Sequence, residues 1–297
     1  MAFDDQWKAE LRAAEILKQF QITQLPVDPF AIAKAREIEI QEDPSLSSGI
    51  SGCLMKVGDI FGIMYGSKFA SEGFKRFTVA HELGHYFLDG HVHHLFGDGQ
   101  FIHKSESGFL SKNEHERQAD AFAAALLMPK GLFKTALASA GEGLAAIESL
   151  ANTCGTSLTA TSIRYANLSD DPVAVVCSSE DKIHFAVMSK ALRERQDLTW
   201  IRKGTGLTEQ CATARFNSDI SNVLVGRRAS STANLGDWFI GGDGDVNEEI
   251  IGLGEYRRTL TVLWADDLSN PGEDEEASEN EDDMLLPSER FYRKSRY

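Results

Sequence analysis

Hydrophobic positions recur at three- and four-residue steps near the start of the chain, which predicts an amphipathic helix over residues 5–20. The positions that set this spacing are Trp7, Leu11, Ala14, Leu17 and Phe20. The segment LPVDPFAIAKAREI then predicts a short helix that begins near Pro29, since proline fits the first helical turn. Two β-prone runs flank Gly58 and Asp59 in GISGCLMKVGDIFGIMYG, and this pattern predicts a hairpin.

Two helices with buried faces follow in the sequence. One contains RFTVAHELGHYFL and is expected to end at Asp89-Gly90, and the other runs from about Asn113 to Leu127, before Pro129. Residues 91–112 between them are polar and rich in glycine, so we expect a loop there. The segment GLAAIESLANTCGTSLTATSIRYANL predicts two more helices, and Ser157 is the candidate N-cap of the second.

The pattern changes after Asp170, where short β-rich runs such as VAVVCSS, KIHFAVM and TLTVLWA alternate with turn residues. This alternation predicts a separate, sheet-rich domain. The expected organisation is a first domain over 1–135, a helical segment over 136–170, a sheet-rich domain over 171–265, and an acidic tail over 266–297.

Composition narrows the class of protein. The chain has 297 residues, of which 42% are hydrophobic and 25% are charged, as in a soluble globular protein. We expect a cytoplasmic protein, because no stretch has the length of a membrane span and the start lacks the pattern of a secretory signal. Four scattered cysteines form no C-x-x-C pair, which argues against a disulfide scaffold and a thiolate zinc site.

The net charge of −15 is concentrated in the tail. Ten acidic residues and no Lys or Arg lie in residues 266–283, so the remainder carries only −5. Neither part has the basic surface of a nucleic-acid-binding protein. Residues 157–168, the best candidate for a DNA-reading helix, contain only one basic residue, Arg164, so we do not expect direct DNA binding.

The chemistry centres on His81, Glu82 and His85 in HELGH. Two histidines four residues apart project from one helix face and can each give zinc a nitrogen ligand. A catalytic zinc site needs a third protein ligand and keeps its fourth position for water. Glu82 stands off the shared face, so we assign it as the base that takes a proton from that water.

Two candidates remain for the third ligand. His91 has the spacing of H-E-x-x-H-x-x-G-x-x-H, but Leu88 replaces the glycine at which that pattern turns. Glu116 and Asp120 lie four residues apart on the second helix, so Glu116 can bind metal while Asp120 accepts a hydrogen bond from a ligand histidine. We favour Glu116. Small alanines on that helix would allow the close approach that a shared metal requires.

These motifs together resemble the ImmA/IrrE family of metallopeptidases, over about residues 10–130 and more faintly beyond. The resemblance implies that His81, His85 and Glu116 bind zinc and that Glu82 is the general base. It also implies that Asp120 contacts a ligand residue and does not itself bind the metal. Gln118 departs from the acidic residue that the family often has there. Zinc is the expected metal, with Mn²⁺ or Fe²⁺ as alternatives.

The resemblance also implies an α+β fold, with a zincin-like peptidase domain of the gluzincin type and a helical extension. Residues 136–170 would be a helix-turn-helix-like segment, and 171–265 a second, GAF-like α/β domain that receives a small-molecule or protein signal. The expected substrate is a helix-turn-helix repressor of the XRE type, whose cleavage switches on stress or mobile-element genes. The alternative is a DNA-binding or ligand-sensing regulator whose metal is structural.

Three further expectations concern the substrate. The strand that contains Ile63 and Tyr65 could be a free edge that pairs with an extended peptide. The group that stabilises the developing oxyanion could be Tyr65, His103 or His184. The last fourteen residues, MLLPSERFYRKSRY, could bind a partner or the body of the protein.

Overall fold

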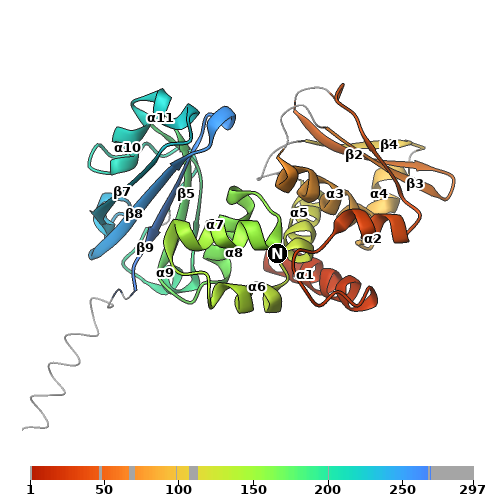
Figure 1. Cartoon of the computed structure of the whole chain (residues 1–297), viewed down its shortest axis with the longest axis horizontal. Helices are drawn as coiled ribbons and strands as arrows, with labels where there is room; N and C mark the ends of the chain where they lie inside the picture. Colours follow the sequence, from red (N-terminus) through yellow and green to blue (C-terminus); the bar gives the residue numbers. More distant parts are fainter. Residues whose placement is uncertain are drawn as a thin grey trace, which may run out of the picture. The chain divides into compact units, whose positions relative to one another are not determined.

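A computed structural model describes residues 2–46, 49–66, 71–97, 99–106, 113–199, 201–266 and 268, with the side chains of 2–6 left out. The chain divides into two compact units, Met1–Leu168 and Ser169–Tyr297 (Figure 1). Apart from residues 266 and 268, the predicted acidic tail lies outside the described residues. No helix in the described ranges has the length and apolar character that a membrane span requires.

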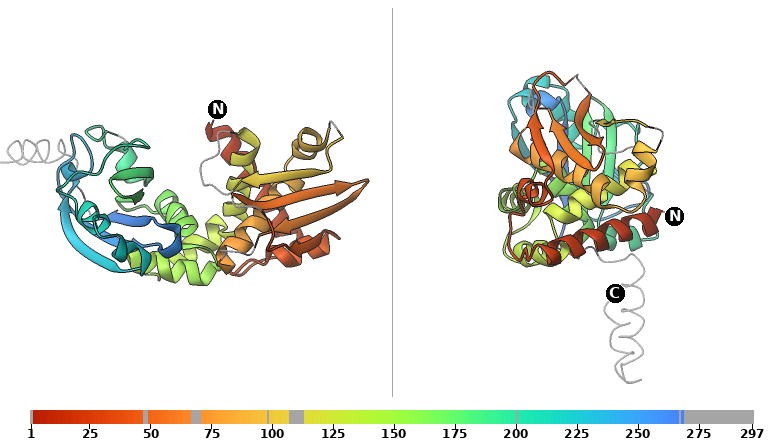
Figure 2. Two further views of the ribbon diagram at one scale, coloured as in Figure 1. Left: turned by 90° about the horizontal axis from the view of Figure 1, so that it is seen from above. Right: turned by 90° about the vertical axis from the view of Figure 1, so that its right-hand side faces the viewer.

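A four-stranded sheet and the helices on one of its faces form the first unit (Figures 1 and 2). The strands have the order β1-β3-β2-β4, with β1 parallel to β3 and the other pairs antiparallel. Their bounds are β1 Glu39–Glu42, β2 Ile50–Val57, β3 Ile60–Tyr65 and β4 Ile102–Glu106. The predicted hairpin at Gly58 is confirmed, and the left-handed φ of +61° there suits glycine.

Helix α3 is the central helix of this unit, and it packs against the sheet and against α5. Ser71 caps the N-terminus of α3 through its side chain, and Asn113 caps α5 in the same way. Helix α1 lies along α5. The helices span α1 Ala2–Gln19, α2 Pro29–Ala35, α3 Glu72–Phe87, α4 His91–Phe96 and α5 Glu114–Leu127.

The remaining helices of the first unit are α6 Lys130–Leu137, α7 Gly143–Cys154 and α8 Leu158–Leu168. Gly155 ends α7 in a left-handed conformation, and the Ser157 hydroxyl accepts a hydrogen bond from the Ala160 N–H at the start of α8, as predicted. Helices α7 and α8 belong to the same compact unit as α3 and α5.

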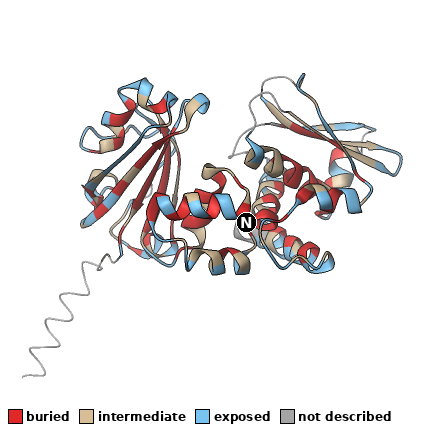
Figure 3. Ribbon diagram, in the orientation of Figure 1, coloured by how far each residue is buried: buried red, intermediate tan, exposed pale blue. Residues whose placement is uncertain are grey.

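The second unit is built on an antiparallel five-stranded sheet with the order β6-β5-β9-β8-β7. Strands β5 and β9 are almost wholly buried (Figure 3). The strands are β5 Val173–Ser179, β6 Lys182–Met188, β7 Arg228–Asn234, β8 Asp245–Gly252 and β9 Thr259–Trp264. Short helices lie between strands: α9 Lys190–Glu194, α10 Ala212–Asn217 and α11 Ile220–Leu224.

Three predictions made from the sequence are wrong for the first unit. The segment expected to be loop contains α4 and β4. Trp7 and Leu11, expected on the buried face of α1, are exposed, whereas Ala9, Ala13 and Ile16 are buried. Alanine's weak hydrophobic signal hid the true buried face.

The third error concerns the substrate strand. The strand with Ile63 and Tyr65 is β3, which lies between β1 and β2 and therefore has no free edge along their paired length. Ile63 is fully buried in the core. The sheet edge beside the candidate metal ligands is β4, which pairs on one side with β2.

Candidate metal centre

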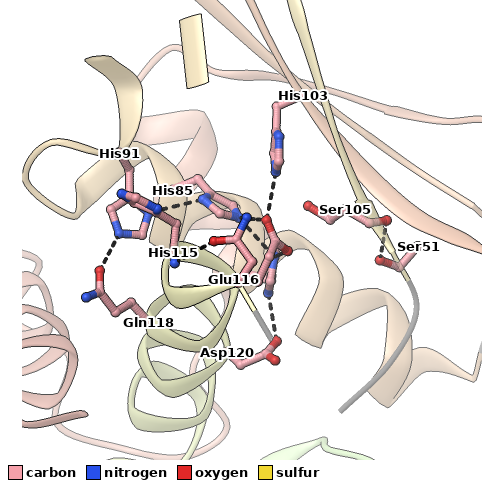
Figure 4. A network of polar contacts seen from close by, with 11 residues as sticks. Ser51, His85, His91, His103, Ser105, His115, Glu116, Gln118 and Asp120 are labelled. Carbon is pink, nitrogen blue, oxygen red and sulfur yellow. Dashed lines mark hydrogen bonds and ion pairs between the residues drawn. The ribbon is translucent and has the colours of Figure 1, made fainter. Parts of the chain in front are cut away.

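Two helices that are distant in sequence bring the predicted ligands together. Gly84 makes this approach possible, because a Cβ at this position would lie only 3.0 Å from the Cα of Ala119 on α5. Helix α3 ends at Phe87, two residues after His85. The two imidazoles of α3 and the Glu116 carboxylate of α5 therefore lie close together, and Figure 4 shows His85 and Glu116 side by side.

The two ring nitrogens and the Glu116 carboxylate group lie at the corners of a small triangle, called the ligand triangle below. His81 Nε2 and His85 Nε2 are 3.1 Å apart, and they lie 3.2 Å and 3.3 Å from the two Glu116 carboxylate oxygens. Ligands placed tetrahedrally at 2.0–2.1 Å from zinc are separated by about 3.3 to 3.4 Å. These distances fit one small divalent cation, and they suit zinc.

Asp120 fixes the orientation of the first histidine. Its Oδ1 lies 2.8 Å from His81 Nδ1. When Nδ1 donates its proton to Asp120, Nε2 keeps a lone pair that faces the other ligands. This contact is the one predicted for Asp120.

His91 lies outside the group of three candidate ligands, and its place in the site was not predicted. Its Nδ1 lies 3.1 Å from Nδ1 of His85, and its Nε2 lies 2.8 Å from the side-chain oxygen of Gln118. A consistent set of tautomers has His85 donating to His91 and His91 donating to Gln118. The two residues thus orient His85, which presents Nε2 to the ligand triangle (Figure 4).

The electrostatics of the centre favour a cation. Burial would lower the pKa of His81, but the carboxylates of Asp120 and Glu116 outweigh it and raise that pKa to about 10. Burial lowers the pKa of His85 to about 3 despite its contact with Glu116. Hydrogen bonds from three histidines hold the pKa of Glu116 far below its usual range, although burial opposes this.

Glu82 lies beside the triangle and is completely buried. Neither carboxylate oxygen has a hydrogen-bond partner among the described residues. Burial raises the pKa of this carboxyl group. A buried, unpaired carboxylate is costly, and a water molecule held by a cation at the triangle would supply the missing donor. The unpaired Glu82 carboxylate is therefore the observation that supports a metal ion with one coordination position open to water.

Strand β2 closes the site over Glu82. A Cβ at Gly52 would lie 2.9 Å from Glu82 Oε1 and 2.5 Å from Thr78 Cγ2, so glycine allows the backbone to pass this close. The Ser105 hydroxyl on β4 is also buried, and it lies close enough to Glu82 to oppose the effect of burial on the pKa of that carboxyl group, although the two do not have hydrogen-bond geometry. Nothing in the sequence signalled either residue.

Of the three residues considered for the oxyanion, one lies at the centre. His103 on β4 places Nε2 3.0 Å from Glu116 Oε1 (Figure 4). The Tyr65 hydroxyl instead contacts Glu42 at 3.3 Å. His184 lies in the second unit, on β6, with its ring 2.6 Å from the Ser179 hydroxyl.

A helix with HELGH, a carboxylate from a second helix and a sheet edge beside them are the features expected of a metallopeptidase domain. Comparison with known families agrees with this class: residues 61–165 match the IrrE N-terminal-like domain, Peptidase_M78. This stretch of the chain is therefore similar to an IrrE N-terminal-like domain, in agreement with the resemblance seen in the sequence. The match also includes α7 and most of α8.

A solved structure described as a Mycobacterium tuberculosis transcriptional regulator is similar to this chain, with a TM-score of 0.55. The sequences are 15% identical, and the match covers 87% of this chain and 75% of that chain. At this identity the similarity concerns the fold alone. A search among curated proteins gave no match.

Proposed function

We propose that the first unit is a zinc-dependent endopeptidase that hydrolyses a peptide bond in a partner protein. The observation that carries this proposal is the buried, unpaired Glu82 carboxylate beside three converging ligand atoms. His81, His85 and Glu116 would hold the metal. A bound zinc ion would polarise the scissile carbonyl and make hydroxide available near neutral pH.

The chain's own residues supply the remaining steps. Glu82 accepts a proton from the attacking water and passes it to the departing amine, a role that suits a carboxyl group whose pKa burial has raised. Asp120 and His91 keep the two ligand histidines in the required tautomers. His103, whose Nε2 lies 3.0 Å from Glu116 Oε1, would donate a hydrogen bond to the oxygen on which negative charge develops.

The peptide would pair with the free edge of β4. The hydrogen bond from the Lys56 N–H to the Phe101 carbonyl fixes the ladder between β2 and β4. By the alternation of antiparallel pairing, the N–H groups of Ile102 and Lys104 then point away from β2. An extended segment of a substrate can accept these hydrogen bonds as an added strand.

We further propose that the substrate is a helix-turn-helix repressor of the XRE type, and that its cleavage switches on stress or mobile-element genes. The second unit would act as a GAF-like sensor of a small-molecule or protein signal. One antiparallel sheet with short helices between its strands is consistent with that assignment. Four buried, free cysteines support a cytoplasmic location.

Direct DNA binding is not part of the proposal. Arg164, the one basic residue of α8, is buried. Its guanidinium donates to the Met128 carbonyl and to the Glu10 carboxylate, so it is not available to a phosphate. A regulator with a purely structural metal remains the alternative, and it would require a fourth protein ligand, for which His103 is the nearest candidate.

The test is incubation of the purified protein and its Glu82→Gln variant with repressors encoded near its gene. We expect the wild type to release two fragments whose masses add up to one water more than the repressor. The variant should bind zinc equally and cleave at least about a hundredfold more slowly. Equal cleavage by both proteins would disprove the role of Glu82, and Glu15→Gln on the exposed face of α1 serves as the control.

A further inference from the structure

A second buried oxygen without a partner lies beside Glu82 at the candidate metal centre. It is the hydroxyl of Ser105 on β4, a residue that is only 1% exposed. Neither this hydroxyl nor either oxygen of the Glu82 carboxylate has a hydrogen-bond partner among the described residues. Polar groups in a protein interior are rarely left unpaired, and one buried water molecule can satisfy two such groups that lie near each other.

The pairing of β2 with β4 explains how the Ser105 hydroxyl comes close to Glu82. Gly52 on β2 is the cross-strand partner of Ser105, and a Cβ at Gly52 would lie 2.9 Å from Glu82 Oε1. The Glu82 carboxylate therefore lies against this pair of residues. The hydroxyl is near enough to oppose the rise in the pKa of that carboxyl group, without a direct hydrogen bond between the two side chains.

The Ser105 side chain points toward the metal centre. Side chains two residues apart on a strand lie on one face, so Ser105 shares its face with His103, whose Nε2 lies 3.0 Å from Glu116 Oε1. Figure 4 shows one Ser105 oxygen directed toward Glu116 and the other, its carbonyl oxygen, directed toward Ser51. The Ser51 hydroxyl donates to that carbonyl at 3.1 Å, which holds the Ser105 backbone and leaves its hydroxyl to the centre.

We propose that Ser105 is a further catalytic residue, and that it holds the attacking water together with Glu82. This inference rests on the proposed peptidase function. The water donates one hydrogen bond to the Glu82 carboxylate and the other to the Ser105 hydroxyl oxygen, so both unpaired groups gain a partner. With both of its O–H bonds fixed, the water has a lone pair of its oxygen directed at the substrate carbonyl.

The reaction balances without a further reactant. The lone pair of the water forms the new bond to the carbonyl carbon, and the electrons of the carbonyl π bond move to the carbonyl oxygen. Glu82 takes the proton that faces it and later gives it to the departing amine, as the C–N bond breaks and the carbonyl forms again. The hydrogen that faces Ser105 stays on the attacking oxygen and becomes part of the new carboxyl group. Ser105 keeps its own proton and acts only by orienting the water.

The kinetic test compares variants of Ser105 on a repressor that the wild type cleaves. Ser105→Ala should lower kcat about tenfold, as expected for one lost hydrogen bond, with KM and zinc affinity unchanged. Ser105→Thr keeps the hydroxyl and should retain most of kcat. Ser139→Ala, which removes an exposed hydroxyl just after α6, is the control and should match the wild type. An unchanged kcat in Ser105→Ala, or an equal loss in Ser105→Thr with one zinc ion per chain, would overturn the proposal.

A double-variant cycle tests whether the two residues act on the same water. Ser105→Ala should slow the Glu82→Gln protein much less than it slows the wild type, because a water without its base gains little from being oriented. Equal losses in the two backgrounds would mean that Ser105 acts independently of Glu82, and they would also overturn the proposal.

A crystal structure of the zinc-loaded protein gives a readout that does not depend on cleavage. We expect one water within hydrogen-bond distance of both Glu82 and the Ser105 hydroxyl, and we expect it to move in Ser105→Ala. A water that contacts Glu82 but not Ser105 would overturn the role of Ser105 and leave the peptidase proposal intact. If the wild type cleaves no repressor although its water contacts both residues, the placement inferred for Ser105 holds and the proposed function fails.

Discussion

At the scale of single residues, the centre consists of ligand atoms and the groups that orient them. His81 and His85, the two candidate ligands on α3, are held in different ways. The carboxylate of Asp120 contacts His81. The imidazole of His91, which in turn contacts the amide of Gln118, contacts His85. A carboxylate makes its histidine more basic, so the two nitrogens that would face the metal differ in charge.

The contact between His85 and His91 leads to the first prediction. His91→Phe keeps the ring's bulk but removes the acceptor for the His85 Nδ1–H. We expect zinc affinity to fall about 10- to 100-fold, as is typical when an outer partner of a ligand is lost. Competition with a chromogenic chelator measures it.

His94→Phe is the matched control on the same helix. The His94 ring is exposed and stacks on His115 without contacting a candidate ligand. If His91→Phe and His94→Phe bind zinc with the same affinity, His91 has no positioning role.

At this scale the candidate ligand residues and Asp120 could be proposed from the sequence, whereas the roles of His91 and Gln118 could not. His81, His85, Glu116 and Asp120 follow from helical spacing, because residues four apart share a face. The position of His91 depends on the turn at Leu88–Gly90, where the backbone becomes extended and then left-handed. That turn sends the chain back beside α5, where Gln118 meets His91, and no local pattern encodes such a meeting.

At the scale of elements, the site depends on how closely α3 and α5 pack. Gly84→Ala would place a methyl group 3.0 Å from the Ala119 Cα, so one helix must shift. We expect a loss of stability of about 1–3 kcal/mol from overpacking, together with weaker zinc binding. Urea unfolding and chelator competition measure the two effects.

Gly131→Ala in α6 is the control, because its new methyl group would meet no atom within 4 Å. It should be neutral or slightly stabilising, since alanine favours the helix. If the Gly84→Ala protein is as stable as the Gly131→Ala protein, α3 and α5 are not closely packed at Gly84, and this prediction is wrong.

The sheet edge gives a second prediction at this scale. Lys104→Pro removes an outward N–H of β4 without breaking the ladder to β2. Peptide cleavage should fall at least about tenfold through a loss of substrate hydrogen bonds, while zinc content stays unchanged. Lys104→Ala loses the side chain but keeps the N–H, and it should cleave normally.

Equal activity of the proline and alanine variants would remove β4 from the substrate site. The sequence alone pointed to β3 instead, because its apolar run looked like an edge. Strand order is set by long-range pairing, which brings β1 against β3 in parallel and leaves β4 outside. Local patterns predict that strands exist and say little about which strand lies at the edge.

At the scale of the whole molecule, the two compact units explain why the change in sequence pattern after Asp170 is so clear. Each unit has a sheet of its own, and the second has a separate core that includes Ala174, Phe239 and Leu263. A domain boundary of this kind can be predicted from sequence, because a sheet-rich pattern replaces a helical one. The boundary near 135 expected for the first domain has no counterpart in the division of the chain, which continues to Leu168.

The division predicts that residues 1–168 fold and bind metal without the rest of the chain. All the candidate ligands and their partners lie in this part. The fragment should unfold cooperatively in urea and bind one zinc ion with the affinity of the full chain, within about threefold. Loss of zinc binding by a folded fragment would show that the second unit contributes to the metal centre.

The central claim is that two histidines and one glutamate hold a single metal ion with one position open to water beside Glu82. A crystal structure of the zinc-loaded protein, with anomalous data at the zinc edge, tests it most directly. We predict one zinc ion bound by His81 Nε2, His85 Nε2 and Glu116, with water as the fourth ligand in contact with Glu82. A zinc ion bound by His103 as a fourth protein ligand, or zinc bound elsewhere, would contradict the account.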